Sequence, residues 1–275
     1  MRVNPYKQNM KISLISCFTF VFILSCFSAK KDTIVYQYTL YGLGTSQQKI
    51  SFLSPIYYDG ISLIGTNGNI KSSLNKINSS SFDFNIDINS NKYNKEIYSF
   101  GVDYIYNKHY LLSFDRYPSN YPNLYLGWGY WFETDAYLKP ENTNNPLYYN
   151  FNNMLCLSIG VEKHYKSIYI LNEFNLSLVG LYSGSEYSSS LPYFFSEENA
   201  SFFEAFQIGS FERNSQMKNR LNIDYRISTK RKVYTIRFQY VISACMLNIN
   251  NNIKHNTFHE FKVGYLFNNS YYVHK

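Results

Sequence analysis

Between residues 219 and 246, apolar and polar side chains alternate strictly along two arms, which a polar turn at residues 229–232 joins. A period of two is typical of a strand with one apolar and one polar face. Each arm has about the 9 to 11 residues that a membrane-crossing strand needs, so the hairpin predicts part of a transmembrane β-barrel. The apolar positions are Leu221, Ile223, Tyr225, Ile227, Tyr234, Ile236, Phe238, Tyr240, Ile242, Ala244 and Met246.

Eight further segments alternate in the same way, most clearly at residues 81–89 and least clearly at 58–66. In the segment at 123–133, Leu and aromatic residues take the outward positions, while Gly127 and Gly129 face inward and leave room in the lumen. In the first segment we place Leu40 and Gly42 on the outward face. The eight segments are residues 34–42, 58–66, 81–89, 98–106, 123–133, 154–163, 167–180 and 261–267.

The turns indicate how many strands there are, because bacterial barrels have an even number, with short turns on the periplasmic side and longer loops outside. The tight turns at 163–166 and 229–232 share one side only if the connection at 181–216 is an external loop. The sequence therefore predicts an all-β, antiparallel transmembrane β-barrel of about ten strands, with every long loop outside. Twelve strands are the alternative if that connection contributes two. Within it, Ser196 caps a predicted short helix with two acids in its first turn.

The composition favours a barrel over a helical membrane protein. Aromatic residues make up 19% of the 275 residues, yet hydrophobic residues reach only 45% and the mean hydropathy is −0.31. After residue 29, no run offers the roughly 18 consecutive apolar residues of a transmembrane helix. Alternating strands produce this mildly polar average while one face still meets lipid, and Tyr is suited to the interfacial girdles.

Residues 1–29 are predicted to be a signal peptide, which leaves a single barrel domain at residues 30–275. Arg2, Lys7 and Lys11 precede an apolar run at 12–27, as in export signals. Removing these three bases lowers the formal net charge from +7 to +4, which is too weak to indicate a nucleic-acid partner. An exported chain whose strands face lipid is expected in the outer membrane.

Four cysteines fall into two pairs. Cys17 and Cys26 lie in the predicted signal, and residues 23–26 resemble a lipoprotein cleavage box, so lipidation of Cys26 is one alternative. Cys156 and Cys245 have lumen-side parity on strands that are not neighbours. They form either a disulfide or two small buried thiols, and we favour the thiols.

Three stretches carry a resemblance to a known family. Residues 41–63 (YGLGTSQQKISFLSPIYYDGISL), 142–150 (NTNNPLYYN) and 191–211 (LPYFFSEENASFFEAFQIGSF) resemble an uncharacterised family of outer-membrane β-barrel proteins from gut anaerobes. The resemblance implies the barrel fold and the outer-membrane location, and it brings no activity. The aromatic end of the last strand resembles the signal by which the barrel-assembly machinery recognises such proteins for insertion. Outer-membrane lipid is the other partner that we expect.

The lumen-facing positions carry a two-sided set of charges. Arg220, Arg226, Arg237 and Lys262 lie on the last three predicted strands, and Asp224 lies among them. Unlike charges on opposite walls would select polar or ionic solutes, whereas in a narrow lumen they would simply pair. The acids on earlier strands are Asp83, Asp87, Asp103, Glu133 and Glu173. As ligand-binding residues we predict Arg220, Arg226, Arg237, Asp83, Asp87 and Asp224.

Other chemistry is weakly supported. His259 has outward parity and begins the last predicted strand, but no serine nucleophile stands beside it. His255 shares its face at a spacing of four, too few ligands for a metal site, and the sequence has no cofactor fingerprint. We therefore expect a narrow channel or a ligand-binding barrel for small polar solutes, without metal or cofactor. The alternatives are an outer-membrane enzyme acting on lipids and a purely structural membrane protein.

Overall fold

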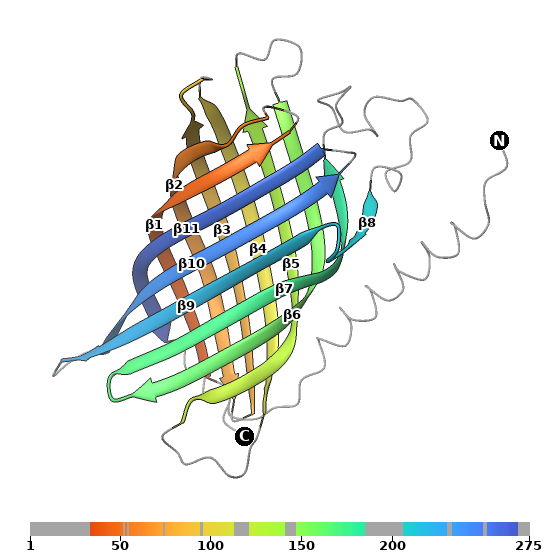
Figure 1. The fold of residues 1–275 in the computed structure, drawn as a ribbon. Helices are drawn as coiled ribbons and strands as arrows, with labels where there is room; N and C mark the ends of the chain where they lie inside the picture. The colour runs from red at the N-terminus through yellow and green to blue at the C-terminus, as the bar shows by residue number, and fades with distance from the viewer. Residues whose placement is uncertain are drawn as a thin grey trace, which may run out of the picture. The chain divides into compact units, whose positions relative to one another are not determined.

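The computed structural model describes residues 34–51, 53, 55–73, 75–93, 96–112, 121–140, 147–184, 206–229, 233–249 and 252–268. These residues form strands and connections only (Figure 1). The strands are β1 (Ile34–Ile50), β2 (Tyr58–Ser73), β3 (Lys76–Ser90), β4 (Ile97–Leu111), β5 (Asn123–Leu138), β6 (Leu147–Tyr165), β7 (Ile168–Gly184), β8 (Gln207–Ser210), β9 (Ser215–Ser228), β10 (Val233–Ile249) and β11 (Asn252–Asn268). The predicted signal peptide at residues 1–29 lies outside the described residues.

Ten long strands close into one antiparallel barrel. Each strand pairs with its neighbours in the chain, β7 pairs with β9, and β1 pairs with β11 to complete the ring. The predicted all-β barrel of ten strands is confirmed, and each predicted strand is present. Most of the strands are longer than predicted, because their ends extend through polar residues that lack a clear apolar face.

The short strand β8 continues the line of β9 rather than adding a spanning strand. β8 pairs with Val179–Tyr182 of β7, and β9 resumes the pairing at Leu176. Between them residues 211–214 bulge out, and Asn214 ties the bulge to the sheet: its Oδ1 accepts a hydrogen bond of 2.8 Å from the Asn248 amide. The predicted helix that begins at Ser196 lies outside the described residues, apart from its last position at residue 206.

The barrel has two different ends. At the turn end, β1 begins, β11 ends, and the two-residue turn at 166–167 joins β6 to β7. The loop end carries the connections at 51–57, 91–96, 139–146 and 185–206. The prediction that every long loop lies outside is wrong for residues 112–122, which join β4 to β5 at the turn end. Because neighbouring strands run antiparallel, successive connections alternate between the two ends, whatever their length.

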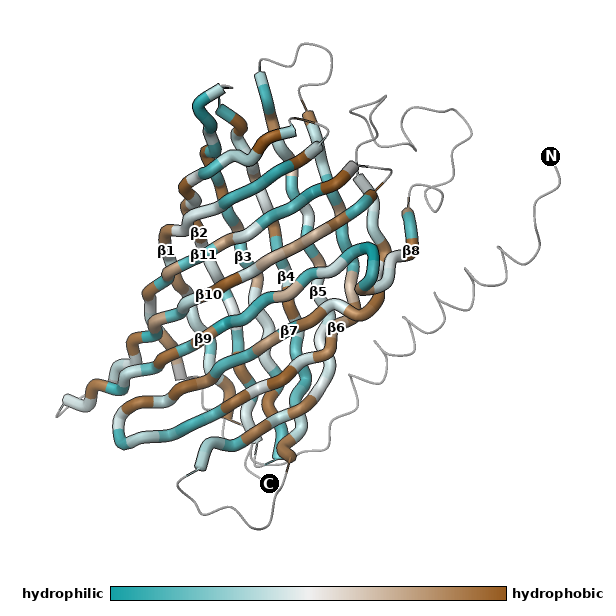
Figure 2. The backbone as a smooth tube through the Cα atoms, viewed as in Figure 1, coloured by the Kyte–Doolittle hydropathy of each residue, from teal (hydrophilic) through white to brown (hydrophobic). Residues whose placement is uncertain are grey.

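The outer surface is apolar along the strands. Figure 2 shows hydrophobic and hydrophilic residues alternating along the tube, as the period of two requires. Outward side chains such as Leu43 and Ile61 are 59% and 65% exposed. Tyr225, Tyr234 and Tyr265 lie exposed near the turn end, as the predicted aromatic girdle requires. No helix in the described part of the chain is long and apolar enough to cross a membrane.

The packed core lies inside the barrel. At the turn end, a cluster formed by Tyr38, Leu40, Ile70, Ile77, Tyr125 and Leu171 draws side chains from β1, β2, β3, β5 and β7. The prediction that Leu40 and Gly42 face outward is wrong, because Leu40 is fully buried in this cluster and Tyr41 and Leu43 take the outward positions. Two further apolar clusters line the half of the lumen nearer the loop end.

Candidate functional site in the lumen

Lysines on one wall of the lumen reach carboxylates on the other. Lys218 on β9 lies with its Nζ 2.5 Å from Asp103 and 3.5 Å from Asp83, although these acids are on β4 and β3. Lys262 on β11 also contacts Asp83, at 3.4 Å, and lies 2.8 Å from Glu260 on its own strand. These side chains are buried or partly buried, so their attraction is weakly screened by water.

Lys254 forms a second cross-lumen group. Its Nζ lies 2.7 Å from Asp135 and 3.4 Å from Glu133 on β5, and it donates to Asn150 Oδ1 on β6 at 3.1 Å. Lys254 is 0% exposed. A buried ammonium needs such partners, because an unpaired one would carry the full penalty of lost hydration.

Nearer the turn end, two arginines each lie beside one acid. Arg237 donates two hydrogen bonds to Asp224, at 2.6 and 2.7 Å, and its guanidinium lies 4.4 Å from the centre of the Tyr38 ring. The paired donors of arginine fit the two oxygens of a carboxylate, which makes this geometry strong. Arg220 lies opposite Glu173 in the register of β7 and β9, at 3.9 Å.

Five of the six predicted ligand-binding residues are buried in the lumen, and Arg226 is not. Arg226 is exposed at the turn end, because β9 is there close to its last residue, Ser228. The structure joins Arg237 to Asp224, but it does not bring the six together at one place. Asp87 instead accepts a hydrogen bond of 2.7 Å from Ser99. The buried five are Arg220, Arg237, Asp83, Asp87 and Asp224.

Sequence reasoning missed four charged residues that matter here: Lys218, Lys254, Asp135 and Glu260. The signal was present in the parity of positions, since Lys254 and Glu260 stand at even spacings before the recognised Lys262. They were missed because the last strand was predicted to begin near residue 261, whereas β11 begins at Asn252. The sequence also places Asp135 beyond the predicted end of the fifth segment.

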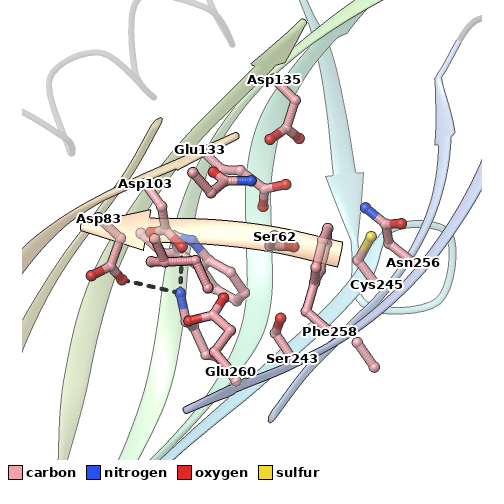
Figure 3. A pocket seen from close by; sticks show the side chains of 15 residues that line it. Ser62, Asp83, Asp103, Glu133, Asp135, Ser243, Cys245, Asn256, Phe258 and Glu260 are labelled. Carbon is pink, nitrogen blue, oxygen red and sulfur yellow. Dashed lines mark hydrogen bonds and ion pairs between the residues drawn. The ribbon is translucent and has the colours of Figure 1, made fainter. Parts of the chain in front are cut away.

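A cavity opens in the half of the lumen nearer the loop end. Its volume is about 50 Å³, and its lining residues come from β2, β3, β4, β5, β9, β10 and β11. Figure 3 shows Asp83 and Asp103 on one side of this space and Cys245 and Asn256 on the other. We call it the lumen cavity. Below it, the turn-end cluster fills the interior with buried apolar side chains.

The histidine that the sequence singled out, His259, lies outside the lumen cavity. His259 is exposed in the middle of β11, opposite Thr45 and Ile242, so the prediction that it begins the last strand is wrong. Its Nδ1 lies 2.9 Å from the Tyr240 hydroxyl. No group of three or more His, Cys, Asp or Glu residues in the described ranges could hold a metal ion.

The two cysteines in the described part of the chain are free thiols. Cys156 is buried and Cys245 is half-buried, and both contribute to one apolar cluster on the lumen side. The favoured prediction of two thiols is confirmed. Cys245 also lines the lumen cavity, which makes it a native reporter of that space.

Comparisons with known proteins identify the chain only in part. The model of a family described as "Protein of unknown function (DUF3316)" matches residues 14–274. No curated protein matches the chain.

Several solved structures resemble the barrel. The outer membrane protease OmpT from Escherichia coli is 9% identical, with a TM-score of 0.45 over 88% of this chain and 98% of that chain. The translocator domain of autotransporter NalP from Neisseria meningitidis is 8% identical, with a TM-score of 0.41 over 95% and 98%. Ail, the attachment invasion locus protein of Yersinia pestis, is 8% identical, with a TM-score of 0.27 over 84% and 98%. No residue's role is taken from these proteins.

Proposed function

Because the chain belongs to this family of unknown function, which supplies no activity, we propose a role from its own residues. The protein is an outer-membrane β-barrel that binds a small polar solute in its lumen. Its other partners are outer-membrane lipid and the barrel-assembly machinery during insertion. Family membership supports the resemblance noted in the sequence and says nothing of the source organism.

The outward faces support the location. Large apolar side chains are exposed around the barrel, and tyrosines gather outside near the turn end. Such a surface is unfavourable in water but matches a bilayer, in which only closed barrels and helices satisfy their backbone hydrogen bonds. The closed ring of ten strands meets that requirement.

One observation carries the proposed binding role: the lumen holds a charged cavity above a packed apolar floor. Fifteen residues line the cavity, and the turn-end cluster below it joins residues from five strands at 3% exposure or less. A channel needs a continuous polar path, whereas a binding site needs a concave space with a few placed polar groups. The arrangement favours binding over passage.

Two measurements test this proposal. In the outer-membrane fraction, the unboiled protein should migrate faster on SDS gels than the boiled protein, because a folded barrel stays compact in SDS. Purified protein in planar bilayers should then give no stepwise conductance. A soluble protein without a heat-dependent shift would contradict the location, and steady conductance steps would replace the binding role with the channel alternative.

A further inference from the structure

The lumen cavity contains more acids than its basic partners balance. Five carboxylates line it: those of Asp83, Asp103, Glu133, Asp135 and Glu260. The ion pairs of the described residues bring three lysines to these five acids, namely Lys218, Lys254 and Lys262. Within these ion pairs, two formal negative charges are left over. A surplus of buried carboxylates is unfavourable unless a cation or protons compensate for it.

Two buried polar side chains at the same cavity lack partners for one of their polar atoms. Asn256 is 3% exposed, and its Oδ1 accepts no hydrogen bond. Trp131 is also 3% exposed, and its indole N–H has no acceptor. About nine in ten buried polar groups in folded proteins have a hydrogen-bond partner. Unsatisfied donors and acceptors at a cavity therefore indicate a bound molecule or ordered water. The unpaired carbonyl oxygen of Asn256 beside surplus carboxylates requires a ligand that donates hydrogen bonds, whereas the indole N–H of Trp131 requires an acceptor such as ordered water.

The rest of the cavity lining indicates what kind of group joins the hydrogen-bond donors of the ligand. Ile64, Phe258 and the Trp131 ring give the cavity apolar wall between the acids. The acids form two groups: Asp83, Asp103 and Glu260 lie at Lys218 and Lys262, and Glu133 and Asp135 lie at Lys254. Two groups of acids with apolar wall between them fit charged groups joined by carbon atoms. The cavity volume of about 50 Å³ limits the ligand to a small, thin molecule.

We infer that the lumen cavity binds a small aliphatic amine, a cation whose ammonium or guanidinium groups are joined by a short carbon chain. This inference rests on the proposed binding function and names its ligand class. The ammonium groups contact the surplus carboxylates and Asn256, and the methylene groups pack on the apolar wall. Lys218, Lys254 and Lys262 hold the acids in fixed positions.

Three probes of equal chain length separate charge from size. They are 1,4-diaminobutane as cation, 1,4-butanediol as neutral molecule and succinate as anion, each titrated calorimetrically into the folded barrel in a nonionic detergent. The diamine should bind saturably, at least tenfold more tightly than the other two. Equal or tighter binding of the diol or succinate would overturn the amine assignment while leaving a ligand-binding barrel. Binding of none of the three would overturn the amine assignment, and conductance would decide the proposed function separately.

Two matched variants locate the site. Glu133→Gln removes a cavity carboxylate, and Lys254 keeps Asp135 at 2.7 Å and Asn150 at 3.1 Å. Glu162→Gln makes the same change on a 5% exposed acid near the turn end, away from the cavity lining. Diamine affinity should fall about tenfold in the first variant and stay within about twofold in the second, since tenfold corresponds to about 1.4 kcal/mol. Equal effects in both would contradict the placement.

A third variant keeps every charge. Ser243 faces the cavity from β10, and Ser243→Leu fills space without altering an acid or a lysine. It should abolish diamine binding, while heat-modifiable mobility on SDS gels shows that the barrel is folded. If Glu133→Gln does not fold, Ser243→Leu decides alone. Unchanged diamine binding in a folded Ser243→Leu barrel would overturn the inference.

Discussion

The two halves of the lumen use the same kinds of residue in different ways. In the turn-end half, Arg237 is matched to Asp224 by two hydrogen bonds, and an apolar cluster fills the interior. In the loop-end half, five carboxylates share three lysines around an empty space. Charged side chains are largely withdrawn from solvent in both halves, so burial alone does not reveal a site. The surplus of negative charge and the open space distinguish the loop-end half, where we propose ligand binding, from the packed turn-end half.

The largest expected effect comes from breaking the matched pair. Asp224→Ala leaves the guanidinium of Arg237 buried without its carboxylate, and Arg237 is 1% exposed. Removing one partner of a buried pair lowers the free energy of unfolding by about 3–5 kcal/mol. Urea titration in detergent measures this loss. Arg226→Gln, two positions along the same strand and exposed, should change stability by less than about 0.5 kcal/mol.

A similar but smaller loss is expected from the apolar floor. Leu171→Ala removes a fully buried side chain from the turn-end cluster and should lower the unfolding free energy by about 2–5 kcal/mol. Leu178→Ala, on the same strand but 48% exposed on the outer face, leaves no cavity and should lose less than half as much. Equal losses in the two variants, again by urea titration, would mean that the turn-end half is no better packed than the outer surface.

Removing a surplus acid should act in the opposite direction. Without ligand, Glu133→Gln relieves repulsion among the cavity carboxylates and should raise the unfolding free energy by about 0.5–2 kcal/mol, as substitutions at binding sites often do. Glu162→Gln weakens hydrogen bonds donated by Tyr125 at 2.6 Å and Asn123 at 3.1 Å, so it should lower that energy by about 1 kcal/mol. A lower unfolding free energy in both variants would contradict the proposed difference between the two halves of the lumen.

The smallest effect is expected outside the lumen. His259→Ala removes one hydrogen bond with the Tyr240 hydroxyl on the exposed face, which is worth less than about 1 kcal/mol. Diamine binding should be unchanged. Turnover of labelled lipid by the wild type, lost in this variant, would instead support the outer-membrane enzyme and move the functional site from the lumen to the outer face.

The sequence predicts strands well where one face is apolar and the other polar, as at residues 81–89 and 219–246. It fails in β1, because Tyr38 and Leu40 face a packed interior while Tyr41 and Leu43 face outward. Where a strand has apolar residues on both faces, the alternation of positions cannot tell which face meets lipid. The assignment requires knowing which side chains pack inside the lumen.

The site itself is harder to predict than the fold. The contact between Lys218 and Asp103 joins residues 115 positions apart on opposite walls, and no local pattern encodes it. Lys254 was missed because the Asn-rich stretch before it is typical of a loop, although its alternation continues to Lys262. Charges could be assigned to the lumen from parity, but their partners required the register of the closed barrel.

The most direct test uses the native thiol in the lumen cavity. In a Cys156→Ala background, Cys245 is labelled with two methanethiosulfonates, one carrying a trimethylammonium group and one a sulfonate, and each rate is divided by that of a free small thiol. An acidic, accessible cavity predicts faster labelling by the cationic reagent, slowed by 1,4-diaminobutane. Equal normalised rates without protection by the diamine, or no labelling at all, would contradict an acidic binding site in the lumen.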